Sequence, residues 1–358
     1  MRYGKRNRQI TYLSAVLASC AVIAACSSGS SGSGGSGGSA GTASSGTVSV
    51  NVGTSSPIKV TLPLKIGVFV SYDCASFGEV EDAAMKTYAA QHNLNLTFFD
   101  ACFDQNKQFD QLQSAIADKK YNVLAVAPVE GTTICHMLST QAPAAGLLVA
   151  VYDQQLCNRF MNDGTAEWQP GTLNYISGYD SKQAIFNWFD AIVKQFGPDQ
   201  TVGIVEGVPT DSLHWKIAQV LAQFKTQYPQ FNVESIANTD YSTAEGYTAT
   251  KTMLAAHPNL TMVIAPQSDI TLGAARAISQ AGKTKSVKLI DYGGDKAVVN
   301  LMKQGEVALT IPTYPATEGI EVLQSLIAMA EGKQVPRVIN PNFEVITPAN
   351  VDSYTPQY

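Results

Sequence analysis

From Pro63 onward, short apolar runs alternate with longer segments in which apolar residues recur every three or four positions. The short runs are typical of strands buried on both faces, and the longer segments have the period of amphipathic helices. In the first half of the chain we expect strands at 64–71, 95–101, 121–128 and 147–153, with helices at 80–93, 108–120 and 134–146 between them. This order predicts βαβ units with a parallel sheet.

The same alternation restarts after a polar interval at 162–180. The expected helices are 184–196, 214–228, 245–257 and 272–282, and the expected strands are 201–207, 231–239, 260–266 and 288–294. The final elements are a crossover strand at 307–315, a helix at 317–332 and a closing strand at 342–348. Two doubly wound α/β lobes in succession account for this order most simply.

The first residues of the chain follow a different pattern. An apolar run at 11–25 is preceded by basic residues and followed by Cys26. The basic residues are Arg2, Lys5, Arg6 and Arg8. A charged start, a short apolar run and small residues before a cleavage point indicate a secretory signal, because a membrane-spanning helix needs a longer apolar stretch.

The last four residues of this signal, Ile23-Ala24-Ala25-Cys26, resemble the bacterial lipobox, in which the cysteine is lipidated and the chain is cut before it. We therefore expect a signal peptide at 1–25 and a lipid anchor on Cys26. The alternative is an ordinary signal peptide with an unrelated cysteine. The Gly- and Ser-rich residues that follow offer little apolar surface to bury, so 26–60 is predicted to be a flexible tether reaching about 30 Å. We expect an exported protein, periplasmic or at the cell surface and anchored to a membrane.

Composition limits the kinds of partner. Without its first 26 residues the chain retains 20 basic and 29 acidic residues, a net charge of −9. This acidic balance argues against nucleic acid or an anionic membrane surface as a partner. The chain is 45% apolar and long enough for two domains with substantial cores. A monomer is expected.

Four cysteines follow the signal: Cys74, Cys102, Cys135 and Cys157. An even number in an oxidising compartment indicates disulfides, with three possible connectivities. In the flavodoxin-like sheet order, strand 1 lies beside strand 2 and strand 3 beside strand 4. Pairing 74 with 102 and 135 with 157 then joins neighbouring loops at one sheet edge, although free thiols are the alternative. No CxxC pair is present and the histidines are scattered, so we expect no metal and no cofactor.

Five segments in order carry a family resemblance. They are IGVFVS (66–71), VLAVAPVEGT (123–132), LLVAVYDQ (147–154), the run from AAHPNLTMVIAP to KLIDY (255–292), and GEVALTIPTYPATEGIEVLQSLIAMAEGKQVP (305–336). Over 63–352 the chain resembles the type I periplasmic substrate-binding proteins of the ribose, galactose and autoinducer-2 group. The resemblance implies two Rossmann-like, flavodoxin-like lobes with parallel sheets, joined by three hinge crossings around a ligand cleft. The N-terminal lobe would comprise 61–172 and 314–342, and the C-terminal lobe 173–313 and 343–358.

The resemblance also implies a set of ligand-binding residues. Phe77 stands at the family's aromatic position after the first strand, and Asp153 at an Asp that takes ligand hydroxyls. The other matched positions are Trp215 for an Arg, Tyr241 for an aromatic residue, Gln267 for an Asn and Thr313 for a hinge Gln. Gln154 replaces an Arg and Gly293 replaces an Asp, with Asp291 and Asp295 on either side of it. These departures put ribose itself in doubt and imply that amides and aromatic rings read the ligand.

The autoinducer-2 binders offer a second comparison. Their cysteine pair lies around the same helix and strand as Cys135 and Cys157, and their Thr-Asp before a helical Trp resembles Thr210-Asp211 before Trp215. Asp211 therefore joins the expected binding residues. Ser71 stands where those proteins have a ligand-contacting Lys, which argues against that ligand.

The expected function is that of a binding protein which captures a small sugar or polyol by hinge closure and delivers it to an ABC permease. A sensory subunit that presents the same closed form to a histidine kinase or chemoreceptor is the alternative, as is a binder of an autoinducer-2-like ligand. No GxSxG motif in the folded region, P-loop or GxGxxG motif is present, so we do not expect an enzyme. A related repressor would carry a basic helix-turn-helix where this chain has its signal and tether.

Overall fold

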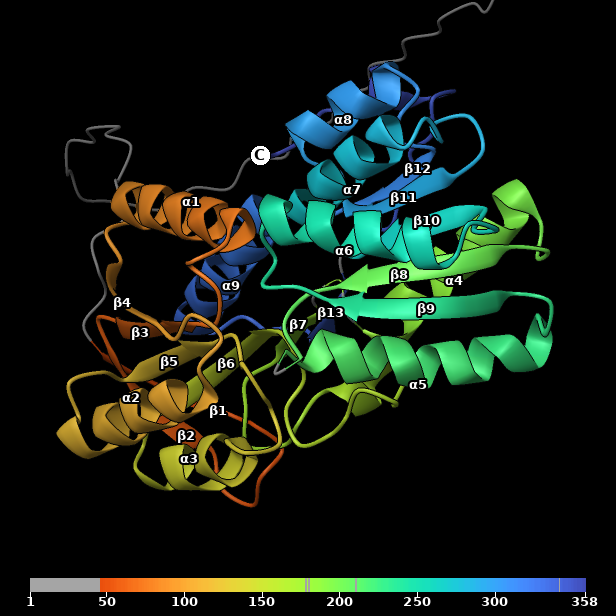
Figure 1. The fold of residues 1–358 in the computed structure, drawn as a ribbon. Coiled ribbons are helices and arrows are strands. Elements are labelled where there is room, and N and C mark those ends of the chain that lie inside the picture. Colours follow the sequence, from red (N-terminus) through yellow and green to blue (C-terminus); the bar gives the residue numbers. More distant parts are fainter. Residues whose placement is uncertain (1–45, 178, 180, 210, 341) are drawn as a thin grey trace, which may run out of the picture. The chain divides into compact units, whose positions relative to one another are not determined.

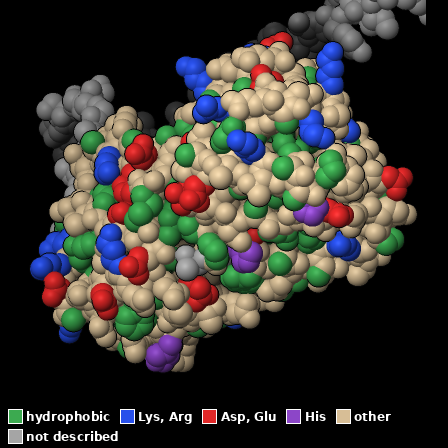
Figure 2. Space-filling model, viewed as in Figure 1, with side chains coloured by type: hydrophobic (Ala, Val, Ile, Leu, Met, Phe, Trp, Pro, Cys, Tyr) green, Lys and Arg blue, Asp and Glu red, His purple; other side chains and the backbone are tan. Residues whose placement is uncertain are grey.

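The computed structural model describes residues 46–177, 179, 181–209, 211–340 and 342–358. The expected signal peptide, Cys26 and most of the expected tether lie outside these residues. Among the described residues, every helix is too short or too polar to cross a membrane. On the face shown in Figure 2, Lys and Arg side chains are scattered among Asp and Glu rather than gathered over one element.

The N-terminal lobe contains a six-stranded sheet, in which five strands come from the first half of the chain and the sixth, β13, from near its C-terminal end (Figure 1). Its strands, in spatial order, are β13 (Val338–Ile339), β7 (Tyr175–Ser177), β6 (Leu148–Asp153), β5 (Val123–Val126), β3 (Lys65–Val70) and β4 (Asn95–Asp100). All neighbouring pairs are parallel. The helical segments of this lobe are α1 (Ser76–His92), α2 (Gln105–Asp118), a π-helical turn (Met137–Gln141), α3 (Ala142–Ala144), a 3₁₀ turn (Gly164–Glu167) and α9 (Pro315–Ala330).

The second half builds a five-stranded parallel sheet. Its strands, in spatial order, are β12 (Leu309–Pro312), β11 (Lys288–Gly293), β10 (Met262–Ala265), β8 (Thr201–Glu206) and β9 (Asn232–Asn238). The helical segments are α4 (Lys182–Phe196), α5 (Ser212–Gln227), α6 (Thr243–Ala256), α7 (Ser268–Gln280), α8 (Lys296–Lys303) and a 3₁₀ turn (Val351–Ser353). In each sheet, the strand that comes first along the chain (β3 or β8) lies between the second (β4 or β9) and the third (β5 or β10). The predicted flavodoxin-like order is therefore confirmed.

Burial explains why these segments form strands and helices. Every residue of β5 is fully buried, as expected for a strand covered by helices on both faces. Polar side chains begin several helices: the Asp104 carboxylate accepts hydrogen bonds from the Asn106 and Lys107 amides, which otherwise lack partners at a helix start. The C-terminal lobe has an aromatic core that includes Trp188 and Phe224. Local signals and the core thus favour the same fold.

The chain passes between the two sheets three times. It leaves the six-stranded sheet after β7, returns to that lobe between β12 and α9, and leaves it again after β13 to form a bridge between Ile346 and Thr310. The sequence assigned residues 173–313 to the C-terminal lobe, but β7 pairs with β6. The first crossing therefore lies after Ser177, later than predicted, because the three-residue strand is too short to show a pattern.

The predicted tether extends too far along the chain. β1 (Gly46–Val50) and β2 (Ile58–Leu62) form an antiparallel hairpin, which buries Val50, Val52 and Val60 in the core of the N-terminal lobe. The Arg337 guanidinium donates a 2.8 Å hydrogen bond to the Asn51 carbonyl oxygen. Alternating valines in this Ser- and Thr-rich stretch supply one apolar face, so residues 46–60 belong to the folded body.

Two further elements differ from the sequence prediction. The helix expected at 134–146 is present as a continuous helical segment at 135–144, but its middle, Met137–Gln141, is a π-helical turn and its last turn is α3, with Pro143 near the start of that turn. The closing strand expected at 342–348 is reduced to the one bridge at Ile346. The apolar pattern therefore located the helix correctly but overstated the closing strand, which pairs at one residue only.

The predicted cysteine pairing is confirmed. Cys74 is bonded to Cys102, with Cα atoms 5.5 Å apart, and Cys135 to Cys157, with Cα atoms 4.9 Å apart. The first disulfide joins the loops that follow β3 and β4, and the second joins the loops that follow β5 and β6. Each therefore ties two neighbouring loops at the carboxyl edge of the same sheet.

Candidate functional site

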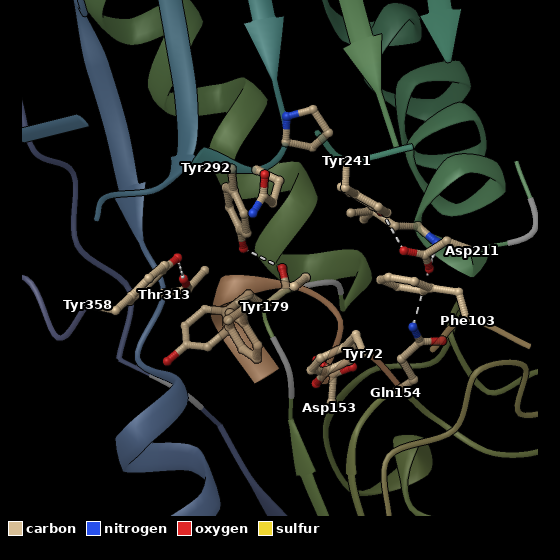
Figure 3. Close-up of a pocket in the computed structure, with 15 residues that line it drawn as sticks. Tyr72, Phe103, Asp153, Gln154, Tyr179, Asp211, Tyr241, Tyr292, Thr313 and Tyr358 are labelled. Atoms are coloured by element: carbon tan, nitrogen blue, oxygen red, sulfur yellow. Dashed lines mark hydrogen bonds between the residues drawn. The ribbon is translucent and has the colours of Figure 1, made fainter. Parts of the chain in front are cut away.

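A cavity lies between the two lobes at the carboxyl ends of their strands (Figure 3). The described residues that line it are Tyr72, Ala75, Phe77, Phe103, Asp153, Gln154, Tyr179, Asp211, Leu213, Tyr241, Pro266, Gln267, Tyr292, Thr313 and Tyr358. Its volume is about 110 Å³. This volume is several times the roughly 10 to 15 Å³ that a single water needs, so the cavity has room for a small ligand.

The position of the cavity follows from the topology. In parallel α/β sheets the loops after the strands converge at one edge, where the strand order reverses. Phe77 lies at the start of α1, Phe103 lies in the loop after β4, and Asp153 ends β6. From the other lobe, Asp211 lies after β8 and Gln267 after β10. Residues far apart in the sequence therefore meet because the two carboxyl edges face each other (Figure 1).

Asp211 joins both lobes through its carboxylate. It caps α5 by accepting a 3.0 Å hydrogen bond from the Leu213 amide. The same carboxylate accepts a 3.4 Å hydrogen bond from Gln154 of the N-terminal lobe and one from the Tyr241 hydroxyl. Gly207 leaves room for Tyr241, because a Cβ atom at residue 207 would lie inside the tyrosine ring. One carboxylate thus holds an amide and a phenol at the cavity wall.

Asp153 is fixed from its backbone. Its φ angle is 60°, in the left-handed region that non-glycine residues rarely adopt. Its amide donates a 2.9 Å hydrogen bond to Glu318, and its carbonyl oxygen accepts a 3.0 Å hydrogen bond from Tyr175. Such strained positions persist only where the surroundings hold them, and they gather at functional sites. Asp153 is 8% exposed and belongs to the cavity wall.

Acidic groups surround Asp153 on the protein side. Burial raises the pKa of Glu81 well above its ordinary value, and the charge of Asp153 raises it further. Burial likewise raises the pKa of Tyr72, with the charge of Asp153 as the next cause. Among the described lining residues, the charged side chains are both carboxylates, Asp153 and Asp211. The wall therefore suits a ligand that donates hydrogen bonds and carries no negative charge.

Aromatic rings form most of the remaining wall. The Phe77 ring lies edge-on to Tyr72, Tyr179 and Tyr358, with ring centroids 5.3, 6.5 and 6.4 Å apart. Phe103 of the N-terminal lobe stacks on Tyr241 of the C-terminal lobe. Aromatic faces cover the apolar C–H face of a ring-shaped ligand and contribute hydrophobic area.

Most of the predicted binding residues come together in this cavity. Those that line it are Phe77, Asp153, Gln154, Asp211, Tyr241, Gln267 and Thr313. Gln267 has a second function as the cap of α7, where its side-chain oxygen accepts hydrogen bonds from the Asp269 and Ile270 amides.

The other three predicted residues lie elsewhere. Trp215 packs edge-on against Phe160 and lines a small neighbouring cavity. Asp291 is fully buried and accepts hydrogen bonds from the hydroxyls of Thr271 and Thr310 and from the Gly294 amide. Asp295 caps α8 through the Val298 amide. Asp291 and Asp295 thus bond groups of their own lobe, and Trp215 is half-buried beside Phe160, orientations that sequence matching did not reveal.

The sequence analysis also missed part of the wall. The lining residues that it did not name as binding residues are Tyr72, Ala75, Phe103, Tyr179, Leu213, Pro266, Tyr292 and Tyr358. Tyr72 and Phe103 each follow the end of an expected strand by a few residues, and that spacing was a usable signal. Tyr358 follows no regular element. Among the described residues, no group of three or more His, Cys, Asp or Glu side chains is arranged to hold a metal ion.

Comparisons with known proteins agree with this architecture. Residues 66–334 match the family described as periplasmic binding protein domain. The chain is 24% identical over 296 residues to the xylitol-binding protein of Mycolicibacterium smegmatis, covering 80% of this chain and 78% of that protein. It is 24% identical over 214 residues to the D-ribose/D-allose-binding protein of Pseudomonas aeruginosa, covering 59% of this chain and 64% of that relative's length.

Solved structures share the fold. An ABC transporter solute-binding protein from Bacillus halodurans with bound myo-inositol superposes with a TM-score of 0.70 at 20% identity, covering 82% of this chain and 98% of that one. The Caulobacter myo-inositol-binding protein gives 0.70 at 17% identity, covering 81% and 95%. The two-lobe α/β fold predicted from the sequence is confirmed. The chain belongs to the periplasmic binding protein family, with the type I two-lobe fold, and this is a family of binding proteins rather than enzymes.

Proposed function

We propose that this chain is the extracytoplasmic solute-binding lipoprotein of an ABC transporter. It captures a small sugar or polyol between its lobes and delivers it to the transmembrane permease. The observation that carries the proposal is that Asp153 of one lobe and Asp211 of the other line the same cavity. A ligand hydroxyl bonded to each carboxylate would link the two lobes.

The chemistry of the wall favours a hydroxylated ligand. Carboxylate and amide oxygens accept hydrogen bonds from hydroxyl groups, and aromatic faces cover C–H faces. The names of the relatives and of the solved structures mention ribose, allose, xylitol and myo-inositol. All are small neutral molecules with several hydroxyls, which supports the same class of ligand here.

Ligand binding and lobe closure are coupled in this proposal. A ligand that contacts both lobes binds the closed arrangement more tightly and therefore shifts the population toward it. The closed surface is then what the permease recognises. A dissociation constant near 1 μM corresponds to about −8 kcal/mol, which a few buried hydrogen bonds and stacked rings can supply after the cost of ordering.

A thermal-shift screen against pentoses, hexoses and polyols tests the ligand class. A ligand present at 100 times its dissociation constant stabilises the folded chain by about 2.7 kcal/mol. We expect at least one member of the panel to raise the melting temperature. The proposal fails if no sugar or polyol does so.

The transport step needs a separate experiment. Deleting the gene should abolish uptake of the identified ligand, measured with radiolabelled sugar, and the unmodified gene should restore it. Unchanged uptake together with loss of a ligand-induced transcriptional response would favour the sensory alternative.

The anchor is tested at Cys26. Replacing it with Ser should move the protein from the membrane fraction to the soluble exported fraction, because the lipid forms on the thiol. Cys20→Ser is the matched control, since Cys20 lies inside the signal. A Cys26→Ser protein that stays with the membrane would contradict the lipoprotein assignment.

A further inference from the structure

Tyr358 forms one end of the cavity although it follows no strand of either sheet. Its hydroxyl lies 2.9 Å from the Thr313 hydroxyl, and its main-chain oxygen accepts a 2.7 Å hydrogen bond from the Lys296 amide. Its ring lies edge-on to Phe77 of the opposite lobe. Tyr358 therefore contacts a crossing segment, the C-terminal lobe and the N-terminal lobe.

The neighbouring residues hold this segment in place. The Gln357 side-chain amide donates a 2.6 Å hydrogen bond to the Thr317 hydroxyl at the start of α9. The Tyr354 hydroxyl donates a 2.8 Å hydrogen bond to the Gly294 carbonyl oxygen. The position of Tyr358 is thus fixed by contacts on both sides rather than by a single bond.

The adjacent strand leaves space for the tyrosine. Gly293 has a φ angle of 154°, and a Cβ atom built on it would collide with the Ser268 hydroxyl and come within 3.2 Å of the Tyr358 hydroxyl. A larger residue at 293 would displace the phenol. The absence of a side chain at Gly293, at the end of β11, therefore leaves the space that the Tyr358 hydroxyl occupies.

The two carboxylates and the Gln154 amide lie away from one end of the cavity (Figure 3). Asp211 and Gln154 lie on one side together with the rings of Phe103 and Tyr241, and Asp153 lies between the two ends. Tyr358 and Tyr179 lie on the other side. At this aromatic end, the hydroxyls of Tyr358 and Thr313 already bond each other. That end presents mainly ring surface to a ligand.

We propose that the cleft selects a ring-shaped sugar or polyol with one polar edge and one apolar edge, such as a deoxy sugar, and that Tyr358 forms the wall for the apolar edge. This inference rests on the proposed function and names the ligand class within it. Hydroxyls of the ligand face Asp153 and Asp211, and a methyl group or unsubstituted ring carbon faces Tyr358. A ligand hydroxyl at the aromatic end meets ring surface and neutral hydroxyls instead of a carboxylate or an amide, so its lost bonds to water are replaced less well than at the polar edge.

Matched sugar pairs test the selection directly. Calorimetric titration of the folded mature chain would compare glucose, galactose and mannose with their 6-deoxy forms. We expect at least one 6-deoxy sugar to bind about 10 to 100 times more tightly than its parent, the range for one unmatched hydroxyl in an apolar pocket. This comparison uses the unmodified protein and does not depend on any variant folding.

Two variants test the role of Tyr358. Tyr358→Ala should remove the preference for the deoxy form, leaving the two partners within about threefold of each other. Tyr358→Phe keeps the ring and should keep the preference. The assignment of the wall to Tyr358 is overturned if Tyr358→Ala retains the preference, or if Tyr358→Phe loses as much affinity as Tyr358→Ala, because the hydroxyl rather than the ring would then read the ligand.

The two proposals fail in different ways. If the chain binds members of the wider sugar screen but every pair favours the hydroxylated parent, the proposed function stands and the inference on the apolar edge is wrong. If no sugar or polyol binds, both are wrong.

Discussion

Phe103 of the N-terminal lobe stacks on Tyr241 of the C-terminal lobe, with ring centroids 5.3 Å apart and ring planes inclined by 19°. Both residues have positive φ angles, 59° for Phe103 and 68° for Tyr241, which non-glycine residues rarely adopt. Both also line the cavity. The stack thus joins the two lobes directly at the wall of the cleft.

Removing this stack should speed ligand release. A stacked aromatic pair contributes about 0.5 to 1.5 kcal/mol beyond its buried area, and this pair forms only when the lobes are together. We expect Phe103→Leu to increase the dissociation rate of the ligand found in the screen about 2 to 10 times, measured by stopped-flow fluorescence.

A second stacked pair provides the control. Phe99 stacks on Phe69 within the N-terminal lobe, with ring centroids 4.7 Å apart. Phe99→Leu should lower thermal stability but leave ligand dissociation unchanged. Equal dissociation rates for Phe103→Leu and the unmodified chain would show that the stack does not hold the lobes together.

The two disulfides should differ in their effect on binding. By the chain-entropy estimate, closing loops of 28 and 22 residues stabilises the fold by about 3 to 4 kcal/mol each. Cys74 and Cys102 directly precede Ala75 and Phe103 in the sequence, and both of these neighbours line the cavity. Replacing Cys74 and Cys102 by Ala should therefore weaken ligand binding as well as stability.

Replacing Cys135 and Cys157 by Ala is the matched comparison. Denaturant unfolding should show a similar loss of stability, whereas calorimetric affinity should change little. The positioning role of the first disulfide is refuted if both double variants bind with the same affinity.

Local patterns explain why most of the fold was predictable. Apolar runs located the main strands, and the helical period located the main helices. The general sheet order of α/β lobes then predicted the cysteine pairs. Asp153 and Gln267 were found because the family resemblance matches each of them to a ligand-binding position. Trp215 and Asp291 were misplaced because the rotation of a helix or the inward face of a strand end depends on tertiary packing. Tyr358 gave no signal, since its position depends on Lys296 and Thr313.

Asp153 and Asp295 were both predicted to bind ligand, and their variants should separate them. Asp153→Asn keeps the size of the side chain, and Asn tolerates the positive φ angle, so the backbone is retained. Losing the carboxylate as an acceptor of charge-assisted hydrogen bonds costs about 1.5 to 3 kcal/mol. We expect about 10 to 100 times weaker binding by calorimetry with a normal unfolding transition.

Asp295→Ala should give the opposite result. It removes the cap of α8 and should lower the free energy of unfolding by about 1 kcal/mol. Ligand affinity should stay within about twofold, because Asp295 lies outside the described lining of the cavity. Unchanged binding by Asp153→Asn would make Asp153 a structural residue.

Asp291 should make the protein less stable as the pH rises. Burial raises its pKa from 3.8 to about 6, against the hydrogen bonds from Thr271, Thr310 and Gly294 that lower it. The folded state therefore binds this proton more tightly than the unfolded state. The stabilisation that the proton provides is complete below pH 3.8 and is lost as the pH rises to about 6, a change of about 3 kcal/mol.

The variant Asp291→Asn removes the titrating carboxyl group and keeps the size and shape of the side chain. Its carbonyl oxygen can accept from Thr310 and Gly294, and the Thr271 hydroxyl can accept from its amide while donating to the Gln267 carbonyl oxygen 3.2 Å away. We therefore expect Asp291→Asn to be as stable as the unmodified chain or more stable at pH 7.5, and to lose its advantage near pH 4. Urea unfolding of both proteins from pH 4 to 8 measures the difference between their free energies of unfolding. The contributions of the other titrating groups are the same in both proteins and cancel in this difference. A difference in the free energy of unfolding that does not change with pH would show that the Asp291 carboxylate is ionised in the folded state throughout this range.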